Sequence, residues 1–118
     1  MERLIAEVIE CIDSEYGRAS EKFGSTNNSD HESYAIILEE VEEAQQELSY
    51  LKGDLSALWS SVKMNSSDEH KLNECSAVER TALLAACEFI QVAAMAKKAA
   101  ITIRTRQENA KYASGDSV

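Results

Sequence analysis

The sequence predicts an all-α fold, because it contains few of the residues from which tight turns between strands are built. Its 118 residues include no proline and only four glycines, whereas hairpin turns and bulges depend on such residues. In addition, serine precedes glutamate by three residues ahead of two apolar runs, a spacing typical of helix N-termini. We therefore expect one antiparallel four-helix bundle over residues 1–113 and a disordered tail at residues 114–118.

The first expected helix covers about residues 2 to 22. Apolar side chains recur there at helical spacing and form a face that can pack on a core, and Gly24 follows as a stop signal. The members of this face are Ile5, Val8, Ile12, Tyr16 and Ala19. The polar run at residues 24–30 is then a loop.

The second expected helix begins at a capping box formed by Ser29 and Glu32 and extends to about Leu51. Gly53 is expected to end it, and Asp54 to cap a short third helix that leans back on the bundle. The apolar stripe of the second helix consists of Tyr34, Leu38, Val41, Ala44, Leu48 and Leu51. The third helix carries Leu55, Leu58, Trp59 and Val62.

A second capping box, formed by Ser76 and Glu79, follows a polar connection at residues 65–74 and opens a long fourth helix. This helix is expected to reach about Tyr112. Its segment at residues 84–96 is apolar throughout except for Glu88 and Gln91, so we expect it to be largely buried.

Composition excludes several classes of partner and setting. The formal net charge of −9 opposes binding to nucleic acid or to an anionic membrane surface. The apolar segment at residues 82–96 is shorter than the roughly 20 residues that a membrane span needs, and no secretory signal is visible. Three cysteines without a C-x-x-C pair favour a reducing, cytoplasmic setting. A chain of this length is only marginally stable alone, so a homodimer or homotetramer is expected.

One face of the second helix carries a row of carboxylates. Because each residue turns a helix by about 100°, Glu40, Glu43 and Glu47 fall beside the apolar stripe, and residues 24–51 contain no lysine or arginine. Like charges one turn apart destabilise a helix by roughly 0.2 to 0.5 kcal/mol per pair. Water can screen so small a repulsion, and a solvated acidic face therefore remains one interpretation of the row.

Glu88 and Gln91 favour a second interpretation. An unpaired carboxylate in an apolar segment costs several kcal/mol or stays protonated, so Glu88 needs a partner. If its helix packs beside the second helix, Glu88 meets the acidic row, and converging carboxylates suit a hard divalent cation such as magnesium. Alternatively, a hydroxyl or a lysine from another subunit satisfies Glu88.

These residues form two motifs with a known counterpart. Glu39-Glu40-x-x-Glu43 followed by Glu88-x-x-Gln91 resembles the E-E-x-x-E and E-x-x-D motifs of the all-α nucleoside triphosphate pyrophosphohydrolases, the MazG-like and dimeric dUTPase superfamily. The flanks, about residues 30–48 and 82–98, are similar to those of small phage or prophage members. The resemblance implies an oligomeric bundle of MazG-like type that cuts a nucleoside triphosphate into the monophosphate and pyrophosphate with Mg²⁺, or Mn²⁺, as cofactor.

The resemblance also implies roles for individual residues. By position, Glu39 and Glu40 are the catalytic residues, with Glu39 a metal ligand or the base that activates water. Glu40, Glu43, Glu88 and Gln91 are the metal ligands. Gln91 departs from the motif, which has aspartate there; its amide oxygen is still a hard ligand but carries no charge.

Two further points come from the residues themselves. Lys98 shares a helical face with Glu88 and is expected to bind a substrate phosphate, whereas other cations near this helix end can simply favour the helix dipole. Tyr34 and Trp59 can stack on a base or pack in the core.

The rival hypothesis is a noncatalytic helical oligomer that binds nucleotide or metal as an interaction or regulatory protein. The sequence lacks G-x-x-x-x-G-K-[ST] and G-x-G-x-x-G, which excludes P-loop and dinucleotide-fold enzymes.

Overall fold

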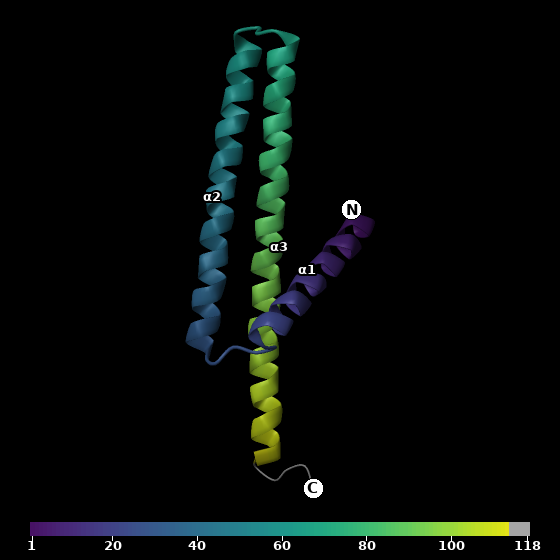
Figure 1. Ribbon diagram of the computed structural model, residues 1–118, viewed down its shortest axis with the longest axis vertical. Coiled ribbons are helices and arrows are strands. Elements are labelled where there is room, and N and C mark those ends of the chain that lie inside the picture. The colour runs from purple at the N-terminus through teal and green to yellow at the C-terminus, as the bar shows by residue number, and fades with distance from the viewer. Residues whose placement is uncertain (114–118) are drawn as a thin grey trace. The chain divides into compact units, whose positions relative to one another are not determined.

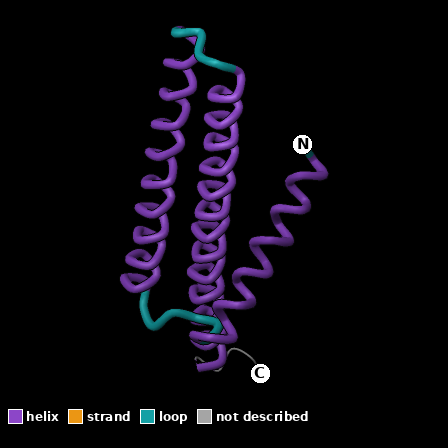
Figure 2. The backbone as a smooth tube through the Cα atoms, turned by 45° about the horizontal axis from the view of Figure 1, so that its top comes forward, coloured by secondary structure: helices purple, strands orange, loops and turns teal. Residues whose placement is uncertain are grey.

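Residues 1–113 form helices joined by short connections, as the computed structural model shows (Figure 1, Figure 2). Helix α1 spans Glu2–Phe23, α2 spans Asp30–Lys63 and α3 spans Asp68–Ala113. The predicted all-α class is confirmed for these residues, among which no strand occurs. The tail predicted at residues 114–118 lies outside the described residues.

The described chain has three helices where four were expected, because Gly53 does not end the second one. It lies inside α2, which continues through Asp54 to Lys63. A glycine in a helix interior costs about 1 kcal/mol relative to alanine, and no proline follows to prevent the helix from continuing. A single glycine is therefore too weak a signal to break a helix of 34 residues.

The start of α3 was also predicted wrongly. Most of the expected polar connection is helical, and Ser76 and Glu79 lie within the helix that they were expected to open. The observed cap is Ser67, whose Oγ accepts a hydrogen bond from the backbone N–H of His70 at 3.2 Å. Capping by Ser67 satisfies a free N–H group at the helix start and so stabilises the earlier N-terminus.

The boundaries around the first loop are confirmed. Gly24 follows α1 with φ of 90°, a conformation that favours glycine, and its N–H donates to the carbonyl of Ser20 at 2.9 Å. At the start of α2, Ser29 Oγ accepts from the N–H of Glu32 at 3.1 Å. These two local signals fix both ends of the loop at residues 24–29.

The described residues belong to two compact units. The hairpin unit, Val41–Phe89, consists of the later part of α2 and the earlier part of α3, which run antiparallel beside each other (Figure 1, Figure 2). The first unit consists of Met1–Glu40 and of α3 from Ile90 onward. In this unit the loop is bound to α3, because the N–H of Asn27 donates to Oγ1 of Thr102 at 2.9 Å.

Few apolar side chains are buried in the single chain. Among the described residues the buried hydrophobic ones are all alanines, at positions 44, 85 and 94, and no large side chain is fully buried. Members of the expected apolar faces are exposed instead: Ile5, Tyr34, Leu38, Leu55, Trp59, Val62, Leu83 and Leu84. The prediction of a largely buried segment around Glu88 is therefore wrong for one chain. A two-helix hairpin covers only one side of each helix, so the remaining apolar surface stays open.

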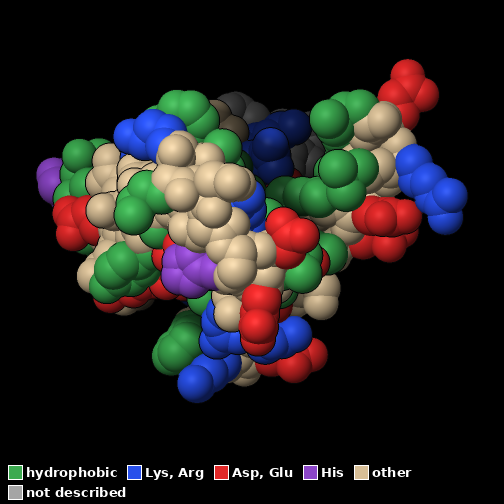
Figure 3. Space-filling model, turned by 90° about the horizontal axis from the view of Figure 1, so that it is seen from above, with side chains coloured by type: hydrophobic (Ala, Val, Ile, Leu, Met, Phe, Trp, Pro, Cys, Tyr) green, Lys and Arg blue, Asp and Glu red, His purple; other side chains and the backbone are tan. Residues whose placement is uncertain are grey.

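The surface reflects this small core. Figure 3 shows hydrophobic side chains interspersed with charged ones on the face that it presents. Over residues 1–113, none of the helices combines the length and the apolar character that crossing a membrane requires.

Candidate metal centre and adjoining cavity

The hairpin unit brings one residue of each motif together. Because α2 and α3 run antiparallel there, Glu43 and Glu88 face each other, with carboxylate oxygens within 4.8 Å. No lysine, arginine or histidine forms a salt bridge with either carboxylate among residues 1–113. Glu43 of the acidic row therefore meets Glu88 as expected, and neither of these two carboxylates has a cationic partner among residues 1–113.

The environment of Glu88 disfavours its charged form. Burial raises the pKa of Glu88 most, and the negative charge of Glu43 raises this pKa further. A hydrogen bond from the neutral carboxyl to Glu43 and the charge of Glu47 act in the same direction. Glu88 is half-buried rather than fully buried, whereas Glu43 is exposed.

These carboxylates fit a divalent cation. Carboxylate oxygens from different side chains can coordinate one hard cation. The positive charge of the cation would offset the repulsion from Glu43 and Glu47 that contributes to the raised pKa of Glu88. Glu43 is open to solvent, so an ion could bind with part of its hydration shell retained, which is the usual mode of magnesium. Glu40 precedes Glu43 by one turn of the same helix and belongs to the first unit.

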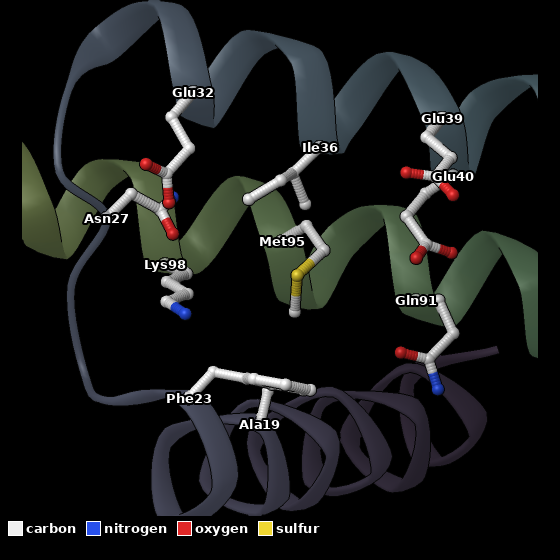
Figure 4. A pocket seen from close by; sticks show the side chains of 10 residues that line it. All are labelled: Ala19, Phe23, Asn27, Glu32, Ile36, Glu39, Glu40, Gln91, Met95 and Lys98. Carbon is white, nitrogen blue, oxygen red and sulfur yellow. The ribbon is translucent and has the colours of Figure 1, made fainter.

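The first unit contains a cavity of about 550 Å³, within the range of small-molecule sites. Its walls come from α1, the first loop, α2 and α3 (Figure 4). The lining residues are Ala19, Phe23, Asn27, Glu32, Ile36, Glu39, Glu40, Gln91, Met95 and Lys98. Four residues predicted for the site, Glu39, Glu40, Gln91 and Lys98, thus share one cavity.

The two ends of the cavity differ in charge. Glu39, Glu40 and Gln91 lie at one end, and Asn27 and Lys98 lie with Glu32 at the other (Figure 4). The apolar side chains of Ile36 and Met95 lie between the two ends, and Phe23 and Ala19 line the side formed by α1. A ligand that fills this cavity would meet oxygen ligands at one end, apolar surface in the middle and a cation at the other.

Lys98 is the main cationic feature of the cavity. Its side chain is buried, with 5% exposure, and no carboxylate forms a salt bridge with it among the described residues. Its ammonium group lies at the same end of the cavity as Glu32 (Figure 4), and an anionic group of a ligand could form a charge-assisted hydrogen bond with it. Seven residues separate Lys98 from Gln91, which corresponds to about 10 Å along a helix. A ligand that contacts both ends must span this distance.

Gln91 has a partner that sequence reasoning did not identify. Its Nε2 donates a hydrogen bond of 2.8 Å to Oε2 of Glu15 on α1, and both side chains are half-buried. Glu15 follows Ile12 by three residues and therefore borders the apolar face of α1. This position beside the apolar face is the only feature of the sequence that could have indicated a role for Glu15, and many surface glutamates share it.

The aromatic candidates do not line the cavity. Tyr34 and Trp59 are 68% and 58% exposed, so neither packs in a core within this chain. Phe23 and Met95 supply apolar surface to the cavity instead. Met95 follows Gln91 by one turn of α3, and helical spacing predicts that it shares the row of Gln91 and Lys98.

Comparison with other proteins adds no assignment. The chain matches no family model, no curated protein and no solved structure. The resemblance to the all-α pyrophosphohydrolases therefore rests on the two motifs and their flanks alone.

Proposed function

We propose that this chain is a magnesium-dependent nucleoside triphosphate pyrophosphohydrolase that converts an NTP or dNTP to the monophosphate and pyrophosphate. The observation that carries the proposal is the contact of Glu43 with Glu88, which have no cationic partner among residues 1–113; burial, and then the charge of Glu43, raises the pKa of Glu88. Glu39, Glu40 and Gln91, from the same two motifs, line a cavity large enough for a small molecule.

In this proposal the metal ligands are Glu40, Glu43, Glu88 and Gln91. When bound, Mg²⁺ would orient the triphosphate and offset the charge that develops during the reaction; Mn²⁺ could replace it. By their motif positions the three carboxylates would offset the charge of the ion, and the amide oxygen of Gln91 would add a neutral ligand. The exposed position of Glu43 leaves a route for water and phosphate oxygens.

Glu39 is the proposed base. It is exposed and lines the acidic end of the cavity, where it can accept a proton from a water molecule. The oxygen of that water forms a bond to the α-phosphorus, and the bond from the α-phosphorus to the bridging oxygen breaks. The bridging oxygen keeps the electron pair and leaves as part of pyrophosphate.

Lys98 is the proposed substrate-binding cation. It would bind an oxygen of a substrate phosphate, at about 10 Å along α3 from Gln91. The apolar side chains of Ile36 and Met95, which lie between the two ends, could then contact the base or sugar. Base and sugar preference would follow from these lining residues.

Turnover tests the proposal. The protein is incubated with MgCl₂ and a panel of NTPs and dNTPs, and monophosphate and pyrophosphate are measured. We expect EDTA-sensitive release of both products from at least one nucleotide, and a loss of about 100-fold or more in Glu43→Gln, which removes a metal ligand. Glu42→Gln is the matched control, because Glu42 is an exposed neighbour that points to the other flank of α2.

The rival function is a noncatalytic oligomer that binds metal or nucleotide. The neutral side chain of Gln91 favours it, because an amide oxygen can bind a cation but an amide cannot act as a base. If no nucleotide yields monophosphate and pyrophosphate while magnesium still binds to wild type and not to Glu43→Gln, the enzyme proposal is wrong and the rival stands.

A further inference from the structure

Asn27, in the loop before α2, brings a buried hydrogen-bond acceptor to the wall of the cavity in the first unit. The residue lines the cavity and is 8% exposed. Its Oδ1 is shielded from bulk solvent, and no donor among residues 1–113 forms a hydrogen bond with it. A buried acceptor without a donor is costly, so a ligand group that donates to Oδ1 is favoured there.

The other polar groups of Asn27 already have partners within the chain. Its Nδ2 donates to Oγ of Ser33 at 2.8 Å, and its backbone N–H donates to Oγ1 of Thr102 at 2.9 Å. Ser33 and Thr102 are themselves buried, which holds the asparagine in place. The amide therefore uses its donor end to fix its own orientation, and its acceptor end is left for another group.

Lys98 lies at the same end of the cavity. The hydroxyl of Thr102, which accepts from Asn27, donates to the carbonyl of Lys98 at 2.8 Å and so connects the asparagine to the turn that carries the lysine. In Figure 4 the Asn27 oxygen lies on the side of Lys98, and the lysine ammonium group is directed into the cavity. These three residues belong to the first unit, so their arrangement is part of one compact body.

We propose that Asn27 is a specificity-determining residue, which selects nucleotides that present an O–H or N–H donor to Oδ1 while Lys98 binds a phosphate oxygen. The donor is a hydroxyl of the sugar or an N–H of the base, which are two sources of the same chemistry. A nucleotide without this donor leaves Oδ1 unpaired, and a site that is built to form such a bond discriminates strongly against it. The inference rests on the proposed function, because it takes the ligand to be a nucleotide.

Binding of nucleoside monophosphates tests the inference without reference to turnover, because these compounds are products of the proposed reaction. Calorimetry in metal-free buffer identifies the tightest ligand among AMP, GMP, CMP and UMP. Wild type is then titrated with the 2′-deoxy form of this ligand, with its 3′-deoxy form and with a base analogue that lacks N–H groups. We expect at least one of these analogues to bind about tenfold more weakly, and its identity shows whether the sugar or the base supplies the donor.

Asn27→Leu removes the acceptor at similar volume and keeps the backbone N–H that binds Thr102. We expect this variant to bind the parent monophosphate about tenfold more weakly than wild type does, and to bind the discriminating analogue within about twofold of the parent. The two substitutions, one in the protein and one in the ligand, then remove the same hydrogen bond.

Asn28→Leu is the matched control, because Asn28 is an exposed neighbouring asparagine that does not line this cavity. We expect it to keep the affinity and the discrimination of wild type within about twofold. Lys98→Met measures the phosphate contact separately and should weaken binding of every monophosphate. Circular dichroism confirms that each variant is folded, and the comparison of analogues on wild type needs no variant at all.

Several results would overturn the inference. If wild type binds all the analogues as tightly as the parent, or if Asn27→Leu keeps the discrimination, Oδ1 does not select the ligand, and the proposed function still stands. Equal loss of discrimination in Asn27→Leu and Asn28→Leu assigns the effect to the loop and not to Oδ1. Absence of monophosphate binding to wild type also overturns the inference, and turnover of the triphosphate panel then decides the proposed function independently.

Discussion

At the scale of single residues, the raised pKa of Glu88 makes stability depend on pH and on metal. A folded chain that binds the proton more tightly than the unfolded chain is stabilised below the ordinary pKa, here 4.5, and loses this stabilisation as pH rises through the folded-state value. Glu88→Gln imitates the neutral carboxyl at every pH. In metal-free buffer we therefore expect the variant to melt above wild type at pH 7, with a difference that disappears near pH 4.

Magnesium should stabilise wild type more than it stabilises Glu88→Gln. At about 100 times the dissociation constant, a ligand that binds only the folded state stabilises it by about 2.7 kcal/mol, so wild type should gain this amount and Glu88→Gln little of it. Thermal melts with and without MgCl₂ measure both effects. Parallel pH curves for Glu88→Gln and wild type in metal-free buffer would contradict the prediction.

Helical spacing predicted which residues of the candidate site share one face of one helix, but pairing residues of different helices needed an assumption about packing. The motif spacing placed Glu43 opposite Glu88 once the two helices were assumed to pack together. Glu15 could not be assigned to Gln91 in this way, because 76 positions separate them and the docking of α1 decides the pairing. Nothing in the local pattern distinguishes Glu15 from the other exposed or half-exposed glutamates of α1.

At the scale of helices, a glycine predicted the end of a helix only where the backbone adopts a conformation that other residues avoid. Gly24 adopts a positive φ that other residues avoid, and the helix does end there. Gly53 has ordinary helical geometry, and the helix continues. The Ser76 and Glu79 pair has the spacing of a capping box but competes with Ser67, which satisfies a helix start nine residues earlier. Sequence alone could not rank such alternatives.

The same substitution at two glycines should therefore have opposite effects on stability. A Cβ added at Gly53 meets no atom within 4 Å, so Gly53→Ala should stabilise the fold by about 1 kcal/mol. Gly24→Ala places a Cβ on a backbone with φ of 90° and should destabilise it by about 1 to 2 kcal/mol. Urea unfolding measures both changes. A lower stability of Gly53→Ala would indicate that the helix is interrupted at residue 53.

At the scale of the whole molecule, the exposed apolar side chains predict self-association. Leu55, Trp59 and Val62 recur at helical spacing on α2 and are 55%, 58% and 48% exposed. They form one apolar stripe on the hairpin unit, while the buried hydrophobic residues of the described chain are three alanines. A second copy could cover this stripe, as the expected homodimer or homotetramer requires, and would supply the apolar burial that a single chain lacks.

Sedimentation velocity tests this arrangement. Wild type should sediment as a dimer or larger species at micromolar concentration, and Trp59→Glu should shift the distribution toward monomer. Ser60→Glu is the control, since it adds the same charge at an exposed neighbouring position outside the stripe. A monomeric wild type, or equal dissociation by both variants, would contradict the prediction.

The contact between the first loop and α3 has a consequence for how the cavity responds to a ligand. Oγ1 of Thr102 accepts from the N–H of Asn27 and donates to the carbonyl of Lys98 at 2.8 Å. One hydroxyl thus connects the loop to the helical turn that carries the buried cation. A ligand that stabilises the turn at Lys98 also stabilises the hydrogen bond of the Asn27 amide. The Asn27 amide proton should therefore exchange more slowly with solvent when a ligand occupies the cationic end of the cavity.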